Sequence, residues 1–147
     1  MPEVLPIASD HAGFELKQRL VVELRTLGFE PLDLGTDSTA STDYPDYAHA
    51  VADRVGQGDA QHGVLICGTG LGMSYAANRH SGVRGAVVWN DDVARLSRQH
   101  NDANILILPA RFVSADDAVT ILRTWLATAF EGGRHAARVA KIDEVPA

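Results

Sequence analysis

Residues 64–72 read VLICGTGLG and lead directly into the helix-prone segment 73–78. A short apolar run without alternation is typical of a central parallel strand that is covered on both faces. Glycines allow the chain to turn sharply and let backbone N–H groups converge on an anion, beside the positive end of the following helix. This strand–loop–helix unit therefore predicts an α/β fold with a ligand site at the end of the strand.

The same alternation of apolar runs and helical patterns extends along the chain in both directions. Further strands are predicted at residues 4–8, 29–34, 86–89 and 105–108, and helical spacing at about 16–27, 44–55, 93–100, 114–130 and 134–142. Strands separated by helices imply right-handed crossovers and a parallel sheet. We predict a three-layer α/β/α Rossmann-like fold with a five-stranded parallel sheet, in one domain of residues 1–147 whose residues 131–147 form a C-terminal helical extension.

Composition narrows the class of protein. Thirteen basic and nineteen acidic residues give a formal charge of −6, which argues against nucleic-acid binding but leaves room for a small anion in a local Arg/His pocket. A single cysteine cannot form an internal disulfide. Neither a signal peptide nor a membrane-spanning run is recognised in the sequence, so no membrane contact and a cytoplasmic location are expected.

Polar side chains occur at the ends of several predicted strands. Asp10 and His11 follow the first strand, Cys67 ends the third, and His100 and Asn101 precede the last. Ligands of such sheets bind at strand ends, so we expect the fold to bring these groups together. A thiolate beside convergent N–H groups is suited to removing a proton next to a carbonyl, although a buried structural thiol is an equally good interpretation of Cys67 from its position alone.

Two other kinds of site are disfavoured. Gly68-x-Gly70 with Asp91 about twenty residues on partly matches a dinucleotide fingerprint, but Met73 replaces the third glycine and the motif does not open the chain. None of the six histidines lies in a His-Glu-x-x-His motif and there is no cysteine pair, so no metal site is expected.

For some side chains the spacing leaves the role open. Arg134 and Arg138 share one face of the last helix and are either a phosphate clamp or a solvated basic face. Arg111 and Lys141 are similar candidates with less support. Tyr44 either belongs to a helix start or lines a pocket.

Six segments taken together resemble the type-B ribose-5-phosphate isomerases of the ribose/galactose isomerase family. They are IASDHAGFELK at 7–17, TDYP at 42–45, ICGTG at 66–70, AAN at 76–78, LSRQHNDAN at 96–104 and FEGGRH at 130–135. They keep the order of the family and extend over nearly the whole chain.

The resemblance implies interconversion of D-ribose 5-phosphate and D-ribulose 5-phosphate through an enediolate, without metal or organic cofactor. Four residues would carry the proton transfers and the opening of the furanose ring: Cys67 as base, Thr69, Asp10 and His100. The others would bind the phosphate, the sugar or the developing charge: His11, Gly68, Gly70, Leu71, Gly72, Asn101, Arg134 and Arg138. A homodimer with a shared active site is also implied, and further pairing to a tetramer is left open.

Tyr75 and Pro109 depart from the family pattern at positions where a smaller aliphatic residue and a glycine are expected. Both changes bear on the size of the pocket. The alternatives are therefore the same chemistry on allose 6-phosphate, galactose 6-phosphate or a tetrose phosphate, and a binding module without catalysis.

Overall fold

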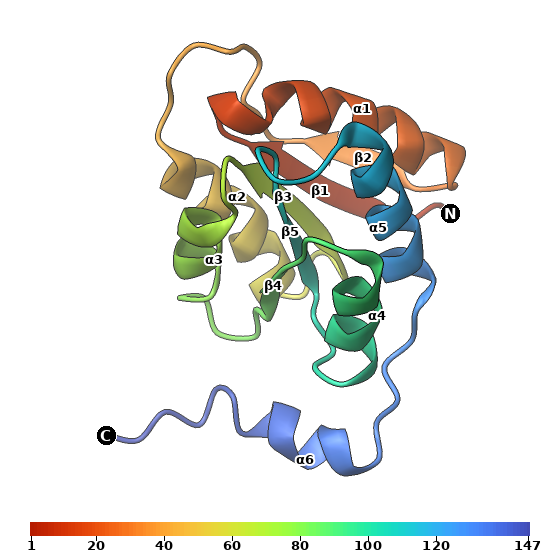
Figure 1. Cartoon of the computed structure of the whole chain (residues 1–147). Coiled ribbons are helices and arrows are strands. Elements are labelled where there is room, and N and C mark those ends of the chain that lie inside the picture. The colour runs from red at the N-terminus through yellow and green to blue at the C-terminus, as the bar shows by residue number, and fades with distance from the viewer.

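Five parallel strands form the centre of the molecule, in a computed structural model that describes residues 1–147 (Figure 1). The strands are β1 (Val4–Ser9), β2 (Glu30–Asp33), β3 (Gly63–Cys67), β4 (Gly85–Val87) and β5 (Ile105–Pro109), in the order β2-β1-β3-β5-β4. The helices are α1 (Phe14–Thr26), α2 (Tyr44–Gly56), α3 (Leu71–Ala77), α4 (Asp91–Gln99), α5 (Ala115–Ala127) and α6 (Arg134–Ala140), with a 3-10 turn η1 (His11–Gly13) before α1.

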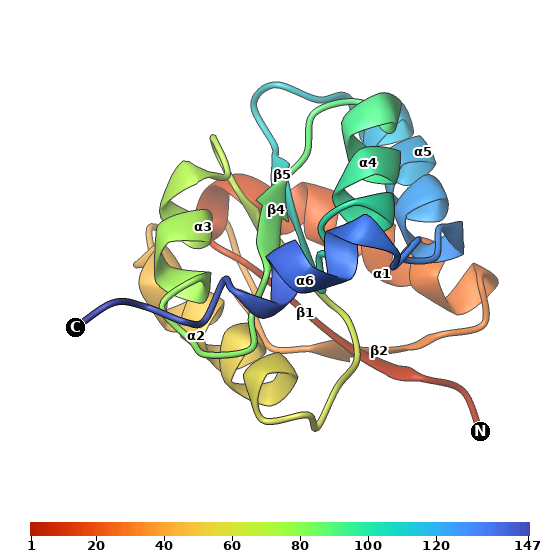
Figure 2. The ribbon, with the colours of Figure 1, turned by 90° about the horizontal axis from the view of Figure 1, so that it is seen from below.

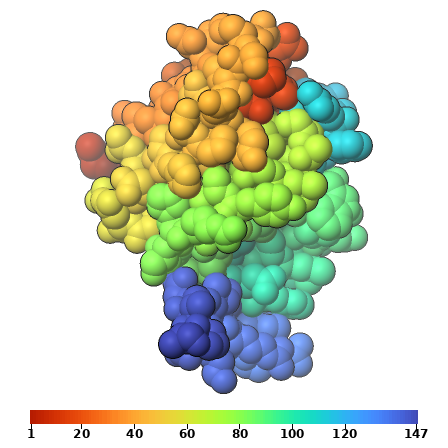
Figure 3. All heavy atoms as spheres, turned by 90° about the vertical axis from the view of Figure 1, so that its left-hand side faces the viewer, coloured from red at the N-terminus to blue at the C-terminus, as the bar shows by residue number.

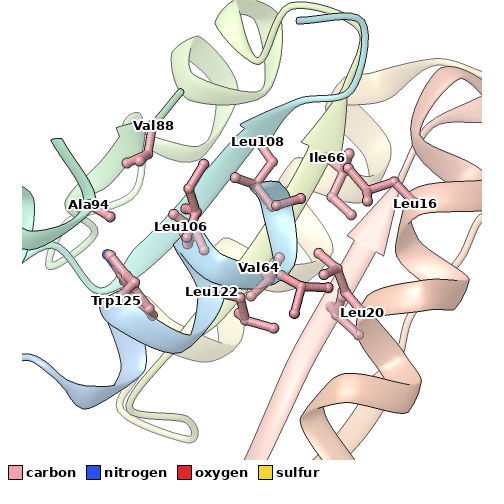
Figure 4. Packing of buried hydrophobic residues seen from close by; sticks show 14 of the residues in the cluster. Leu16, Leu20, Val64, Ile66, Val88, Ala94, Leu106, Leu108, Leu122 and Trp125 are labelled. Carbon is pink, nitrogen blue, oxygen red and sulfur yellow. The ribbon is translucent and has the colours of Figure 1, made fainter. Parts of the chain in front are cut away.

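Two apolar clusters pack on the two faces of this sheet. Helices α1, α4 and α5 cover one face, where Leu20 and Trp125 lie against Val64 and Leu106 (Figure 4). Helices α2 and α3 cover the other face. All residues of β3 and β5 are buried, as expected for central strands that are covered on both sides. The predicted three-layer α/β/α fold is confirmed.

The predicted elements differ from the observed ones mainly after α5. The helical pattern extends to residue 130, but α5 ends at Ala127 and Thr128 has extended backbone angles. Arg98 donates a hydrogen bond to the carbonyl oxygen of Thr128 at 3.1 Å, and the N–H of Glu131 donates to the carbonyl oxygen of Gln99 at 3.1 Å. These contacts with α4 replace the helical hydrogen bonds and lead the chain away from α5.

Helix α6 lies below the body of the molecule in Figure 1, next to the segment that precedes β5. Figure 2 shows it from below, in front of β4 and β5. The loop of residues 36–43 lies at the opposite end, and in Figure 3 the segments around α2 and α3 separate the two. None of the helices is long and apolar enough to span a bilayer.

Candidate active site

A cavity of about 380 Å³ opens at the carboxyl ends of β1, β3 and β5. We call it the thiol cavity. Its lining includes Asp10, His11, Tyr44, Cys67, Thr69 and Arg111. The fold therefore brings together Asp10 and His11, which follow β1, with Cys67 and Thr69 at the end of β3. Tyr75 also lines this cavity, whereas Pro109 is buried at the end of β5, in register with Cys67.

Cys67 is the last residue of β3, and only 5% of it is exposed. The N–H of Gly70 donates a hydrogen bond to its Sγ at 3.2 Å. Gly70 has a φ of 78°, a left-handed conformation that glycine adopts without steric cost and that turns this N–H back towards the thiol. The sulfur therefore combines burial, a backbone donor and access to a cavity.

We call residues 68–72 the glycine loop; some of its backbone N–H groups donate hydrogen bonds within the chain and others do not. The N–H of Gly70 is used by Cys67, and the N–H of Leu71 donates to Thr69 Oγ1 at 3.2 Å. The N–H groups of Gly68, Thr69 and Gly72 donate no hydrogen bond within the chain. The amides of Gly70 and Leu71 thus have intrachain partners, and their contact with a substrate anion stays a prediction.

Asp10 and His11 have defined hydrogen bonds. Asp10 Oδ1 accepts from the N–H groups of Ala12 and Gly13 at 3.0 and 3.2 Å, which fixes the carboxylate at the start of η1. His11 Nδ1 accepts from the N–H of Thr42 at 3.1 Å. A neutral ring that accepts at Nδ1 carries its proton on Nε2, so His11 is able to donate a hydrogen bond to an anion.

Arg111 is a site residue that the sequence indicated only weakly. Its N–H donates to the carbonyl oxygen of Gly68 at 3.0 Å, and a Cβ added to Gly68 would lie 3.1 Å from Arg111 Nε. The guanidinium group lies against the glycine loop and forms no ion pair with a carboxylate. Its position just beyond β5, at the same sheet edge as Cys67, is the signal that could have identified it.

His100, Asn101 and Arg138 line a second cavity, of about 350 Å³, together with His135. We call it the histidine cavity. Residues 100–104 precede β5, so they lie at the amino ends of the strands, on the side of α6 (Figures 1 and 2). The thiol cavity lies at the opposite, carboxyl ends. The expectation that the fold brings His100 and Asn101 to Cys67 is therefore wrong within one chain.

Arg134 and Arg138 are exposed on α6 and form no ion pair. The rings of His100 and His135 are stacked, with centroids 4.3 Å apart and planes at 14°. Burial lowers the pKa of His135 below its ordinary value of 6.5, and positive charge on His100 and Arg134 lowers it further. The carboxylate of Glu131 opposes this shift. The histidine cavity thus carries the positive charge of Arg138, which suits an anion, while the carboxylate of Glu131 lies 4.0 Å from His100.

Known proteins are similar to this chain in sequence and in fold. A family profile described as Ribose/Galactose Isomerase matches residues 5–142. The chain belongs to this family. Ribose-5-phosphate isomerase B of Escherichia coli K12 is 46% identical over 136 residues, which cover 92% of this chain and 91% of the relative. A probable ribose-5-phosphate isomerase B of Mycoplasma genitalium is 46% identical over 138 residues, covering 92% and 91%.

Solved structures of family members are equally similar. The ribose 5-phosphate isomerase of Thermotoga maritima has a TM-score of 0.94 at 52% identity, and the match covers 97% of this chain and 99% of that chain. The ribose-5-phosphate isomerase B of Mycoplasma genitalium, solved with bound ribulose 5-phosphate, has a TM-score of 0.92 at 44% identity, covering 96% and 94%. The resemblance inferred from the six sequence segments is confirmed.

Proposed function

We propose that the chain interconverts D-ribose 5-phosphate and D-ribulose 5-phosphate through an enediolate, with Cys67 as the base. The observation that carries this proposal is the thiol cavity, where the only cysteine of the chain lies beside a glycine loop with free N–H groups. The family relatives named for this reaction and the relative with bound ribulose 5-phosphate support the choice of substrate.

The furanose ring must open before there is a carbonyl to react. Asp10 takes the proton of the O1 hydroxyl through its second carboxylate oxygen, because Oδ1 already accepts two hydrogen bonds. His100 gives a proton to the ring oxygen as the C1–O4 bond breaks. A carboxylate held by backbone donors and an imidazole are a suitable base and acid for this step.

Isomerisation moves one carbon-bound proton. The thiolate of Cys67 removes the proton from C2 of the open-chain aldose and returns it to C1, while the hydroxyl of Thr69 transfers a proton between O2 and O1. The enediolate carries negative charge between these steps. The free N–H groups of Gly68, Thr69 and Gly72 stabilise this charge by preorganised hydrogen bonds.

The phosphate requires hydrogen-bond donors and cations that are not already paired. His11 contributes its Nε2 proton and Arg111 its unpaired guanidinium within the thiol cavity. Arg134 and Arg138 contribute two further guanidinium groups from α6, with Asn101 on the sugar. Arginine suits this role because its planar donors match phosphate oxygens.

Within one chain, Cys67 lies at the carboxyl ends of the strands and His100 at their amino ends, so this mechanism needs two copies of the chain. In a homodimer with two-fold symmetry, the histidine cavity of each copy faces the thiol cavity of the other and two equal sites result. The single domain of residues 1–147, with residues 131–147 as an extension that reaches the second copy, fits this arrangement. A catalytic thiol must also stay reduced, which supports action in the cytoplasm.

The test is the conversion of ribose 5-phosphate to ribulose 5-phosphate by chelator-treated protein. Cys67→Ala is expected to lose about 10²–10⁴-fold in kcat, the usual contribution of a positioned base, while calorimetry still detects substrate binding. Iodoacetamide has a single target, Cys67, and substrate should slow the inactivation. Turnover that survives in Cys67→Ala would remove Cys67 as the base, and a wild-type protein inactive on ribose 5-phosphate would contradict the proposed substrate.

A further inference from the structure

Three potential metal ligands converge at the edge of the histidine cavity. One ligand atom from each of His100, Glu131 and His135 lies within 4.8 Å of the other two. His100 Nε2 is 4.0 Å from Glu131 Oε1, and the His100 ring is stacked on the ring of His135. Glu131 and His135 are four residues apart, but His100 lies far from both in the sequence, so no known ligand-spacing motif identifies the cluster.

The exposure of two of the three side chains gives the cluster room to close. The side chains of His100 and Glu131 are 37% and 51% exposed and are free to rotate, whereas His135 is buried and holds its place. Bonds of about 2.0–2.2 Å to a central ion bring its ligands roughly 3–3.5 Å apart. The stacked rings of His100 and His135 are nearly parallel, so the exposed His100 ring must turn out of the stack to share an ion with His135. We propose that His100, Glu131 and His135 form a binding site for Zn²⁺ or a similar borderline-soft divalent cation.

The ligand set favours this class of cation. Two imidazoles and one carboxylate are a common set of zinc ligands, and they leave a fourth position for water. Hard cations such as Mg²⁺ prefer oxygen ligands and would bind this set poorly. Arg138 lines the same cavity and repels a cation, so Glu131 supplies the compensating charge and is the most sensitive ligand.

The other close histidine pair lacks these features. His49 Nδ1 and His80 Nε2 are 2.7 Å apart and hydrogen-bonded to each other. No third ligand joins them, since the only group of three or more candidate ligands is the one at the histidine cavity. This pair therefore provides a matched control.

Cation binding would inhibit the enzyme, a consequence that rests on the proposed function. When Zn²⁺ holds His100 through Nε2, the nitrogen that faces Glu131, that nitrogen carries no proton to give to the ring oxygen, so ring opening stops. Substrate and cation would compete, and by thermodynamic linkage each weakens the affinity for the other by the same factor.

The site is tested by calorimetric titration of Zn²⁺ into chelator-stripped protein, in a Cys67→Ser background that removes the thiol as a competing ligand. Glu131→Gln and His135→Gln are each expected to weaken zinc binding by about tenfold or more, which corresponds to roughly 1.4 kcal/mol. The controls Glu144→Gln and His80→Gln should bind as the parent does. Equal affinity in all four variants, or no zinc binding by the parent, would overturn the site.

Inhibition is measured separately on protein with Cys67 intact. Micromolar Zn²⁺ should lower turnover of ribose 5-phosphate in the wild type, a chelator should restore it, and Glu131→Gln should need about tenfold more zinc. Inhibition that is unchanged in Glu131→Gln would place the inhibitory zinc elsewhere. If metal-free protein has no isomerase activity, the proposed function fails, and the direct titration still decides the cation site.

Discussion

Arg111 is the residue whose role depends least on a second copy of the chain. Its guanidinium lies in the thiol cavity, against the glycine loop, without an acidic partner. A cation that is not neutralised within the fold remains available for the substrate phosphate. Cys67 was predicted from the sequence because a strand, a cysteine and a glycine loop are contiguous, whereas Arg111 joins them only through the pairing of β3 with β5.

Replacement of Arg111 by Met should therefore impair substrate binding more than chemistry. A hydrogen bond to a charged group contributes about 1.5–3 kcal/mol, so KM for ribose 5-phosphate should rise roughly 10- to 150-fold, with a much smaller change in kcat. Steady-state kinetics measure this split. Arg95→Met, at a surface arginine paired with Asp91 and Asp92, is the control. A KM unchanged in Arg111→Met would show that this guanidinium does not bind the phosphate.

His135 makes stability depend on pH. Burial, His100, Arg134 and Arg138 lower the pKa of its ring in the folded state, and Glu131 only partly offsets them. Between this lowered pKa and the ordinary value of 6.5, the unfolded chain binds more protons at this ring than the folded chain does. The free energy of unfolding should therefore fall as the pH decreases below about 6.5.

Urea unfolding over a series of pH values measures this effect. His135→Gln should show a shallower loss of stability than the wild type in that window, because glutamine does not titrate. His80→Gln, a substitution in the exposed pair with His49, should follow the wild type. Identical pH profiles for His135→Gln and the wild type would rule out this source of acid sensitivity.

At the scale of secondary structure, α6 contributes charged groups but little to the core. Only His135 of this helix is buried, and neither apolar cluster includes a residue of α6. The sequence predicted the helix and the pairing of Arg134 with Arg138 on one face. It did not show that α5 ends at Ala127, because that end depends on hydrogen bonds to α4 rather than on local propensity.

A chain that ends after Gly133 should consequently fold but fail as an enzyme. Cooperative thermal unfolding is expected to persist, because both apolar clusters stay intact. Loss of two arginine–phosphate contacts should lower kcat/KM by about a hundredfold or more. Circular dichroism measures the thermal unfolding, and steady-state kinetics measure kcat/KM. Full activity in the truncated protein would exclude α6 from the active site, and the double variant Arg134→Gln/Arg138→Gln should reproduce the kinetic loss.

At the scale of the whole molecule, the sheet keeps His100 and Cys67 apart, although both were expected from the sequence in one site. Apolar runs and helical spacing predicted the layers and the five strands, because these patterns are local. Candidate site residues were also named from the sequence, but not the fact that His100 and Cys67 lie at opposite ends of the parallel strands. That separation follows from strand direction, since residues before a parallel strand and residues after one occupy opposite edges.

The most direct test of a thiol-based isomerase with a shared site is complementation between two inactive variants. Cys67→Ala and His100→Asn should each be nearly inactive alone. After subunit exchange in an equal mixture, half of the dimers are mixed and each has one intact site, so activity should recover to about one quarter of the wild-type value. Recovery at this level is the predicted result. A mixture that stays inactive although mass spectrometry shows mixed dimers would contradict a site built from Cys67 of one copy and His100 of the other.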